Sequence, residues 1–430
     1  MNVGIVKNEA LKAKPTIGIT GPDFLISSGG VLNHSLNVAR ILSQHYNFIF
    51  VPNPKLIRNY RRNRNKVLKR IEYLKELNVR VPTGLTDALE GRTDARSLIN
   101  GFKDELHLNF IINFNQDYEL LSDDFTYKLA KTLGTGFGVS FHNPCFGNVS
   151  LLSYVSNSIR LSLLGGNIHS FLFRMYQYLR MEKVINNTLR KGNLKLVFIV
   201  NYNCQQRIAS KFEEAHVLSP ANGIFNAESF ASEDDPSIKE GKMKKNQIIF
   251  FGRMSYSKGI FELFPILERI LKKIDINLII VGKFDHRSEE KLFLKKMSRP
   301  QFKGKMHYMG YLDDAEFYRV ISESKVMLCT THADSYSISI LQSLYFGTPV
   351  VAYDIPANSV YKSLDEVRLV NEFDLDSFAD QVLFLVDRVE RGFPFSSEVA
   401  EFIAKHSWNN VAAQYKRYID KALSTDVPLI

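Results

Sequence analysis

Residues 334–354 read DSYSISILQSLYFGTPVVAYD, and this stretch decides the fold. Over residues 337–344 the apolar side chains recur at helical spacing, and Gly347-Thr348-Pro349 then ends the helix. The apolar residues 350–353 follow directly and stop at Asp354, which indicates a buried strand. A helix followed at once by a buried strand is part of the repeating unit of a parallel α/β sheet.

The same alternation of short apolar runs and longer amphipathic stretches continues along the 430 residues of the chain. It predicts two series of strands, separated by a polar stretch at Ala227–Asn246 whose composition is that of a linker. The first series is Thr16–Thr20, Phe48–Pro52, Asn109–Phe114, Phe137–Phe141, Lys195–Val200 and His216–Leu218, and the second is Gln247–Phe251, Asn277–Val281, Lys305–Tyr308, Val326–Thr330, Pro349–Tyr353 and Val367–Val370. Helices are expected between them, among others at Leu32–Gln44, Lys66–Leu77, Glu262–Lys273 and Ala315–Ser322.

This pattern predicts an α/β protein of two Rossmann-like, doubly wound domains that face an inter-domain cleft. A chain of this length also exceeds what one hydrophobic core usually organises. We expect the first domain at 1–226, joined by a C-terminal helix within 407–430, and the second domain at 240–406. Ligands of such sheets bind at the carboxyl ends of the strands, so the loops that follow strands are where site residues are expected.

The composition is that of an ordinary globular protein, with 45% hydrophobic and 23% charged residues. No apolar run approaches the roughly 20 residues that span a bilayer, and the segment Met1–Lys14 lacks the apolar core of a signal peptide. Cys145, Cys204 and Cys329 lie far apart, with neither metal-ligand spacing nor a disulfide pattern. A cytoplasmic location is therefore expected.

Much of the net charge of +10 lies in the segment 55–80. The basic residues of this segment are Lys55, Arg58, Arg61, Arg62, Arg64, Lys66, Lys69, Arg70, Lys75 and Arg80. They predict attraction to anionic lipid headgroups or phosphorylated substrates, and thus peripheral contact with the inner face of a membrane. A solvated face of a basic helix explains the same pattern. No nucleic-acid-binding motif accompanies the segment, so no nucleic acid partner is expected.

The loop after the strand Gln247–Phe251 reads GRMSYSKG over residues 252–259. Gly252 allows a sharp turn at the end of the strand. Arg253 and Lys258 place two positive charges beside the start of a helix, where free amides and the helix dipole also favour anions. The arrangement fits a diphosphate site, although a pair of surface cations has the same sequence.

Asp334 precedes the predicted helix and Gln342 lies inside it, so both side chains can face a ligand above the helix start. The backbone amides of Tyr336, Ser337 and Ile338 would then meet a phosphate. Taken alone, Asp334 is equally explained as a helix cap.

Here the sequence resembles the family-4 retaining glycosyltransferases, the glycosyl transferases of group 1. The resemblance rests on motifs that cover nearly the whole second half of the chain and extend to its C-terminal helix: Gly252-Arg253, Lys258-Gly259, Ile280-Val281-Gly282, Gly310, Asp334 with Gln342, Gly347-Thr348-Pro349-Val350-Val351-Ala352 and His406-Ser407-Trp408. It implies the GT-B fold and transfer of a sugar from a nucleotide-diphosphate sugar. Gly282 and Tyr311, which follows Gly310, join the expected donor-binding residues.

The chain departs from the family at its defining pair of acids. The family carries two Glu where this chain has Asp334 and Gln342. By resemblance the first acid contacts the donor sugar and the second accepts hydrogen bonds from the ribose hydroxyls. Asp334 keeps the charge on a shorter side chain, whereas Gln342 keeps one carbonyl acceptor without the charge.

Weaker similarities lie in the first half of the chain. Gly29 and Gly30 follow the first strand and would let backbone amides approach the donor, although a tight turn needs glycines as well. His142 follows the strand Phe137–Phe141, where the family places a His against the donor sugar. A structural histidine is the competing interpretation.

The resemblance implies a catalytic set of Arg253, Lys258, Asp334 and His142, with no metal ion and no cofactor besides the sugar-nucleotide co-substrate. In the family, the leaving phosphate is thought to deprotonate the acceptor on the same face. The expected partners are a nucleotide-sugar donor and a glycan or lipid-linked acceptor, to which the basic, apolar segment Leu151–Leu189 could contribute a surface. Two alternatives remain: a sugar-nucleotide epimerase, and a catalytically silent homologue that acts as a binding or scaffold protein.

Overall fold

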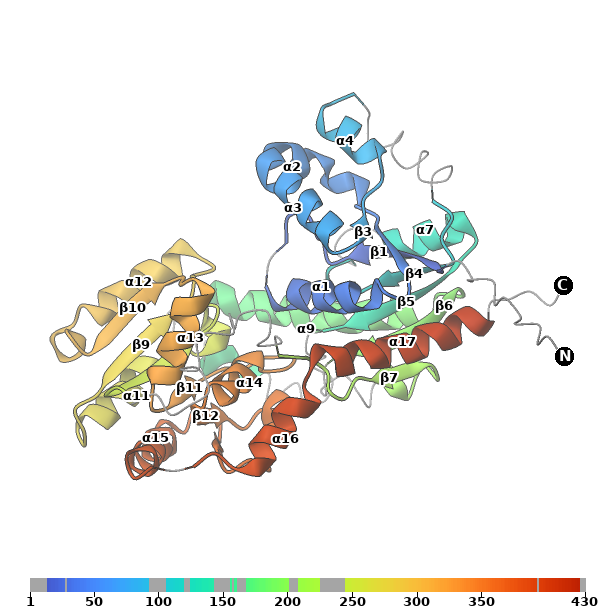
Figure 1. Ribbon diagram of the computed structural model, residues 1–430. Helices are drawn as coiled ribbons and strands as arrows, with labels where there is room; N and C mark the ends of the chain where they lie inside the picture. Colours follow the sequence, from blue (N-terminus) through green and yellow to red (C-terminus); the bar gives the residue numbers. More distant parts are fainter. Residues whose placement is uncertain are drawn as a thin grey trace, which may run out of the picture. The chain divides into compact units, whose positions relative to one another are not determined.

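The computed structural model describes residues 14–27, 29–92, 106–119, 124–142, 155–156, 158–160, 168–200, 208–224, 244–392 and 394–425. The residues form two compact units (Figure 1). One unit consists of the described residues within Met1–Ser140, Arg190–Val197 and Ala412–Ile430, and the other of those within Phe141–Leu189 and Phe198–Val411. Each sheet uses strands from only one of the two predicted series; the predicted domain bounds and the cleft stay predictions.

The first sheet has seven strands in the order β3-β2-β1-β4-β5-β6-β7. These strands are β1 (Thr16–Gly21), β2 (Asn47–Phe50), β3 (Val79–Arg80), β4 (Phe110–Asn113), β5 (Gly136–Phe141), β6 (Leu194–Ile199) and β7 (Ala215–Val217). The helices of this part of the chain are α1 (Gly30–Leu42), α2 (Ile57–Arg62), α3 (Arg64–Glu76), α4 (Gly84–Leu89), α6 (Gln116–Glu119), α7 (Phe125–Leu133) and α9 (Ile168–Leu189). The short edge strand β3 and the helix α2 are absent from the sequence prediction.

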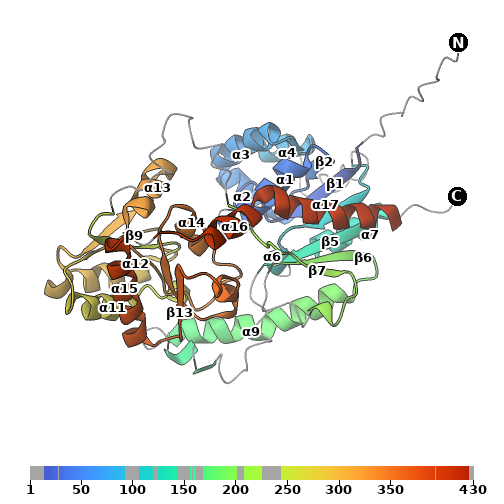
Figure 2. The ribbon, with the colours of Figure 1, turned by 60° about the horizontal axis from the view of Figure 1, so that its bottom comes forward.

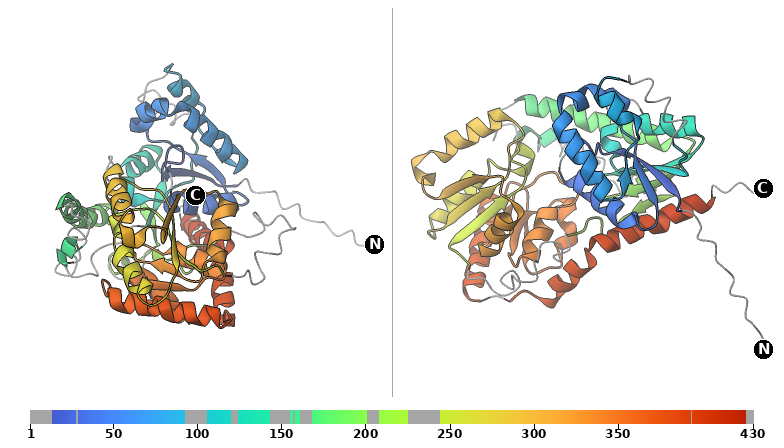
Figure 3. Two further views of the ribbon diagram at one scale, coloured as in Figure 1. Left: turned by 90° about the vertical axis from the view of Figure 1, so that its left-hand side faces the viewer. Right: turned by 45° about the horizontal axis from the view of Figure 1, so that its top comes forward.

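The predicted helix Lys66–Leu77 is the body of α3, but the basic segment forms two helices rather than one. Asn63 separates them, and its amide donates to the carbonyl oxygens of Asn59 and Tyr60 at 3.1 Å each. Helices α2, α3 and α4 lie together in the first unit (Figure 3). Tyr60, Val67 and Leu74 bury their side chains completely, whereas most of the basic residues stay exposed. The segment is therefore amphipathic, with an apolar side that anchors it to the unit.

The second sheet has six strands, all parallel, in the order β10-β9-β8-β11-β12-β13. They are β8 (Gln247–Phe251), β9 (Asn277–Val281), β10 (Met306–Gly310), β11 (Met327–Cys329), β12 (Val350–Tyr353) and β13 (Val367–Val370). The helices are α11 (Leu263–Leu271), α12 (Arg287–Met297), α13 (Asp314–Glu323), α14 (Ile338–Tyr345), α15 (Leu375–Glu390), α16 (Ser397–Lys405) and α17 (Trp408–Thr425), with short 3₁₀ turns at Tyr256–Lys258, Pro300–Phe302 and Pro356–Tyr361.

The core of the second unit lies where α11 and α15 pack on each other and on the sheet (Figure 2). Ile248, Ile266 and Leu385 are 0% exposed there. Burying one such side chain contributes about 1.5–3 kcal/mol. A parallel sheet covered by helices on both faces needs strands that are apolar on both sides and helices with one apolar face.

The ends of the predicted elements mostly agree with the structure to within two residues. The remaining differences arise because caps, rather than hydrophobic periodicity, set where helices and strands end. Of the predicted linker Ala227–Asn246, residues 227–243 lie outside the described residues. Lys244 belongs to the second unit, where its Nζ donates to Gly347 O at 2.8 Å and to Thr348 Oγ1 at 2.9 Å. Burial lowers the pKa of Lys244 to about 8. Lys244 is therefore packed against the second unit, whereas Lys245 and Asn246 are exposed.

Helix α17 contributes to both units, because Trp408–Val411 belongs to one and Ala412 onward to the other. In the first unit Tyr415 is fully buried, 3.0 Å from His34 Nε2 and 3.2 Å from Ser140 Oγ through its hydroxyl. None of the helices in the described ranges combines the length and apolar character that crossing a bilayer requires.

Candidate functional site

The second sheet reverses its direction of winding between β8 and β11. The chain leaves β8 toward β9 and leaves β11 toward β12, on opposite sides. The loops that follow these two neighbouring strands therefore diverge at the carboxyl edge, which is where doubly wound sheets bind their ligands. The two loops carry Arg253, Lys258 and Asp334, so the structure brings these three predicted residues to one edge of the sheet.

Lys258 and Asp334 form an ion pair across this edge. Lys258 Nζ lies 2.7 Å from Asp334 Oδ2, and the two side chains are 17% and 21% exposed. An ammonium has three N–H donors, so a bond to Asp334 leaves Lys258 able to bind an anionic ligand at the same time. Asp334 in turn accepts from the amide of Ser335 at 2.9 Å, which holds its carboxylate at the start of α14.

Arg253 is held much more loosely. Its side chain is 66% exposed, and Nη1 lies 3.5 Å from Oδ2 of Asp285. An exposed pair at this distance contributes about 0–1 kcal/mol, so Arg253 can turn toward an anion at little cost.

Two glycines allow the loops to approach each other. A Cβ on Gly282 would lie 1.9 Å from the carbonyl oxygen of Gly252, and a Cβ on Gly259 would lie 2.1 Å from that of Thr330. Both glycines also have positive φ angles, of 153° and 67°. The motif glycines thus set the spacing of the loops after β8, β9 and β11.

The side chains of Tyr336 and Ser337 point into the protein. Tyr336 is 3% exposed and packs against Tyr361, and Ser337 is 0% exposed with its hydroxyl 2.5 Å from Asn358 Oδ1 and 3.3 Å from Asp334 Oδ2. The amide of Ile338, predicted to meet a phosphate, donates to Tyr336 O at 2.8 Å. Side chains of this helix start therefore support Asp334, and any ligand contact falls to the remaining backbone amides.

Gln342 and Tyr311 differ in exposure. Gln342 is half-buried in the second turn of α14. Tyr311 directly follows β10 and is 81% exposed, an unusual exposure for a ring of this size. The amide of Gly282 donates to Gly310 O at 2.8 Å, so the loop before Tyr311 is tied to the loop after β9.

The first-half candidates lie at the start of α1 and directly after β5. Gly29 has a φ of 103° and caps α1, and Gly30 is the first residue of that helix. His142 directly follows β5 and is 3% exposed. Their predicted roles toward the donor stay predictions.

A buried cluster beneath the loops escaped the sequence prediction. The His332 side chain is 2% exposed, with Nε2 2.5 Å from Glu262 Oε1 and Nδ1 2.8 Å from Glu372 Oε1. The Tyr353 hydroxyl donates to the other oxygen of Glu262, whose side chain is 1% exposed. His332 stands two positions before Asp334, but nothing in the sequence marks either Glu as its partner.

Burial alone would lower the pKa of His332, but the hydrogen bonds from its ring to Glu262 and Glu372 outweigh this and raise the pKa. Phe373 stacks on the same ring, at 4.4 Å between centroids and 18° between planes. Phe373 has a φ of 66°, which is rare for a bulky side chain. Within the described ranges, no three His, Cys, Asp or Glu side chains are grouped so as to hold a metal ion.

Part of the chain is similar to known proteins. Residues 232–390 match the family model described as glycosyl transferases group 1. The chain is 27% identical over 204 residues to the phosphatidyl-myo-inositol mannosyltransferase of Mycobacterium leprae, which covers 46% of this chain and 51% of the relative. It is 19% identical over 176 residues to the GDP-mannose:cellobiosyl-diphosphopolyprenol alpha-mannosyltransferase of Xanthomonas oryzae, covering 40% of this chain and 46% of the relative. The chain thus matches about half the length of these curated relatives.

Solved structures share the fold. Anabaena HepE in complex with UDP superimposes with a TM-score of 0.63 at 12% identity, over 95% of this chain and 100% of that one. Staphylococcus aureus TarM gives a TM-score of 0.54 at 15% identity, over 76% of this chain and 59% of that one. The two Rossmann-like sheets and the superimposed structures show that the chain has the GT-B fold, and its residues 232–390 are similar to the group 1 glycosyltransferases.

Proposed function

We propose that the protein transfers a sugar from a nucleotide-diphosphate sugar to a glycan or lipid-linked acceptor and retains the anomeric configuration. The observation that carries the proposal is the Lys258–Asp334 pair, which places a cation and an acid side by side at the switch point of the second sheet. Similar proteins support it, since one relative is named for GDP-mannose and one solved structure holds UDP.

Each side chain has a part in binding the donor. Lys258 and Arg253 hold the diphosphate, Asp334 contacts the sugar, and Gln342 accepts from a ribose hydroxyl through its amide oxygen. The exposed ring of Tyr311 offers a face on which the base can stack. The amide of Gln342 is a weaker acceptor than a carboxylate, so the ribose is held less tightly than in relatives with Glu.

In the proposed reaction, the bond between the anomeric carbon and the phosphate oxygen breaks, and a bond to the acceptor oxygen forms on the same face. The acceptor hydroxyl gives its proton to the leaving phosphate, which departs as the nucleoside diphosphate. Charge grows on that phosphate in an oxocarbenium-like transition state, and Lys258 and Arg253 stabilise it. Two side-chain cations supply the positive charge, so the proposal includes no metal ion and no further cofactor.

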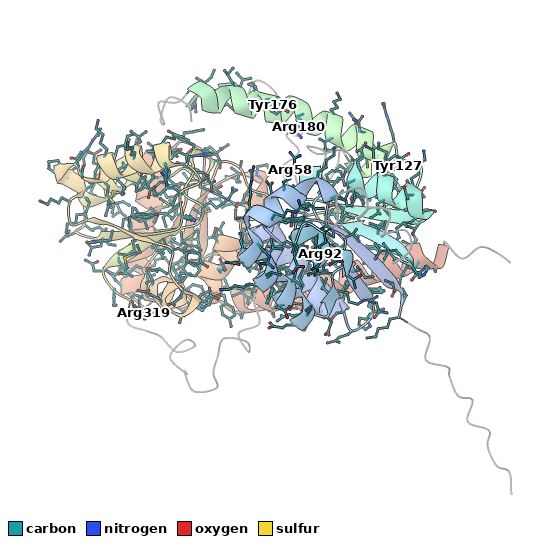
Figure 4. All side chains as sticks on the ribbon, turned by 90° about the horizontal axis from the view of Figure 1, so that it is seen from above. Arg58, Arg92, Tyr127, Tyr176, Arg180 and Arg319 are labelled. Atoms are coloured by element: carbon teal, nitrogen blue, oxygen red, sulfur yellow. The ribbon has the colours of Figure 1, made fainter. Side chains whose placement is uncertain are left out.

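The acceptor proposal rests on exposed cations and rings. Arg58, Arg62 and Lys69 are exposed on α2 and α3, whereas Arg61 donates to Ala88 O and Lys66 to Ile26 O and so also hold the unit together. On α9, Tyr176 is 56% exposed and Arg180 lies 5.6 Å from its ring centre (Figure 4). We propose that these surfaces contact anionic lipid at the cytoplasmic face of a membrane.

A co-sedimentation assay tests the membrane contact. The protein should sediment with vesicles that contain anionic lipid at low salt and be released at high salt. Changing Arg58, Arg62 and Lys69 together to Gln should abolish this, while Lys295 and Lys303, changed to Gln on the second unit, serve as the control. Equal sedimentation with neutral vesicles, or no sedimentation at all, rules the contact out.

The activity is tested by release of nucleoside diphosphate from a panel of sugar nucleotides. Lys258→Ala and Arg253→Ala should lower the turnover, and Lys272→Ala, an exposed lysine at the far end of α11, should leave it unchanged. Turnover without net transfer, as interconversion of free sugar nucleotides, would instead favour the epimerase. Absence of both turnover and thermal stabilisation by any nucleotide would favour the silent homologue.

A further inference from the structure

The carboxyl edge of the second sheet contains a charged cluster that the proposed reaction does not use. Its members end or follow four strands that are neighbours in the sheet, and Glu262 lies at the start of α11. Glu262 follows β8, His332 follows β11, Tyr353 ends β12 and Glu372 follows β13. The His332 ring lies at the centre of the cluster and joins the two carboxylates.

Both contacts of the His332 ring are hydrogen bonds to a carboxylate only when each ring nitrogen carries a proton. Nε2 and Nδ1 each face a carboxylate oxygen, at 2.5 Å and 2.8 Å, and a carboxylate can only accept. A neutral ring has one N–H, so one of the two contacts would become a lone pair against a negative oxygen. The charges that face the ring are those of Glu262 and Glu372. The Tyr353 hydroxyl donates a further hydrogen bond to Glu262 and so helps to stabilise its buried carboxylate.

The same two loops carry the candidate donor-binding residues. Glu262 follows Lys258 by four positions, and His332 precedes Asp334 by two. Two hydrogen bonds join the loops between these points: the His332 backbone amide donates to Ser257 O at 2.9 Å, and the Thr330 side-chain hydroxyl donates to Lys258 O at 2.9 Å. The contacts of the His332 ring with Glu262 and Glu372 add to these hydrogen bonds close to the positions of Lys258 and Asp334.

We propose that His332 is a positioning residue of the donor site, and that its doubly hydrogen-bonded, charged ring holds Lys258 and Asp334 in register for the donor. At 2% exposure the side chain cannot touch the substrate, so it acts through the loops. Phe373 supports this role, because it stacks on the His332 ring from a backbone conformation that is rare for Phe. The inference rests on the proposed function and adds to it a dependence of donor binding on pH.

Binding of UDP and GDP, measured by calorimetry between pH 5.5 and 9.5, tests the proposal. In the wild type the affinity should fall as the pH rises through the pKa of His332, because the neutral ring releases one loop. Glu372→Gln removes one of the two carboxylate charges beside His332 and should therefore move this fall in affinity to lower pH. At the acidic end of the range its affinity should stay within about twofold of the wild-type affinity. His332→Gln should bind roughly 10- to 100-fold more weakly, with little dependence on pH. Glu390→Gln, which alters a carboxylate paired with Lys325, should behave as wild type.

Two ligand-free measurements separate this proposal from the proposed function. In ¹⁵N-histidine spectra near pH 7, His332 should carry a proton on both ring nitrogens. As the pH rises, one of the two N–H signals should disappear, and in Glu372→Gln it should disappear at a lower pH than in wild type. A double-mutant cycle in urea should show that His332→Gln and Lys258→Met are coupled in stability. If no nucleotide binds to any variant, the proposed function fails and the spectra and the cycle decide the positioning role. A neutral His332, an absent coupling, or identical pH curves for wild type and Glu372→Gln overturns the positioning role.

Discussion

Lys258 Nζ lies 2.7 Å from Oδ2 of Asp334, a residue 76 positions further along the chain. One partner follows β8 and the other follows β11, so the pair exists only because these strands are neighbours in the sheet. The pair joins the two loops that diverge at the switch point.

Removal of Lys258 should affect the transition state more than the ground state. We expect Lys258→Ala to lower kcat/KM for the donor by about 100-fold, since it removes a charge aimed at the leaving phosphate. Arg253→Ala should lose less, about 10-fold, because Arg253 is 66% exposed and needs to reorient. Steady-state release of nucleoside diphosphate measures both, against Lys272→Ala. A larger loss for Arg253→Ala than for Lys258→Ala would contradict this ranking.

Replacing Gln342 by Glu should tighten nucleotide binding. A carboxylate accepts from ribose hydroxyls about twice as strongly as an amide oxygen, so we expect the Kd for the nucleoside diphosphate to fall by about 3- to 10-fold. The matched comparison is Gln342→Met, which removes the acceptor at similar size and should raise the Kd. An unchanged Kd in both variants would mean that Gln342 does not face the ribose.

The stability of the second unit should fall as the pH rises. The pKa of His332 is raised in the folded protein, so the folded state keeps a proton that the unfolded chain releases above about pH 6.5. Its contribution is complete below that pH and is lost as the pH rises through the folded pKa, at about 1.4 kcal/mol for each tenfold gain in proton affinity. Urea unfolding between pH 6 and pH 9 measures this. The same pH slope in His332→Gln as in wild type would show that another group is responsible.

Gly282 should tolerate no side chain. In Gly282→Ala the new Cβ would meet the carbonyl oxygen of Gly252 at 1.9 Å, so the loops after β8 and β9 must separate. We expect a loss of about 2 kcal/mol or more in the free energy of unfolding, together with weaker nucleotide binding. Gly304→Ala is the control, because Gly304 has a φ of 76° but open space around it, and should cost only about 1 kcal/mol. Equal losses in the free energy of unfolding for both variants would show that the positive φ angle alone, and not the contact with Gly252, causes the effect.

Tyr415→Phe should destabilise the first unit through its buried hydroxyl. That oxygen lies 3.0 Å from His34 Nε2 and 3.2 Å from Ser140 Oγ, in a fully buried place. Its loss should cost about 1–3 kcal/mol, because polar partners remain in the core. Thermal unfolding shows the shift, and Tyr418→Phe, on the same helix, should change the Tm little. A Tm equal to that of the wild type would show that water replaces the hydroxyl.

The sequence by itself determined the elements of the second sheet and the residues beside its strand ends. Periodicity, glycine stops and strand-terminal polar residues are local signals, so Arg253, Lys258, Asp334 and Gln342 could be named without coordinates. The basic character of segment 55–80 is equally local. The sequence does not show which of its cations stabilise the fold, because Arg61 donates to Ala88 O and Lys66 to Ile26 O through tertiary contacts.

Only the tertiary structure decided how these residues are held. His332 meets Glu262 across 70 positions and Glu372 across 40, and no spacing rule connects residues from the ends of separate strands. The side chains of Tyr336 and Ser337 turned inward for the same reason, because packing against Tyr361 and Asn358 depends on a strand order that the sequence does not state. Local sequence signals identify the residues of the site, and the order of the parallel strands determines which of them are in contact.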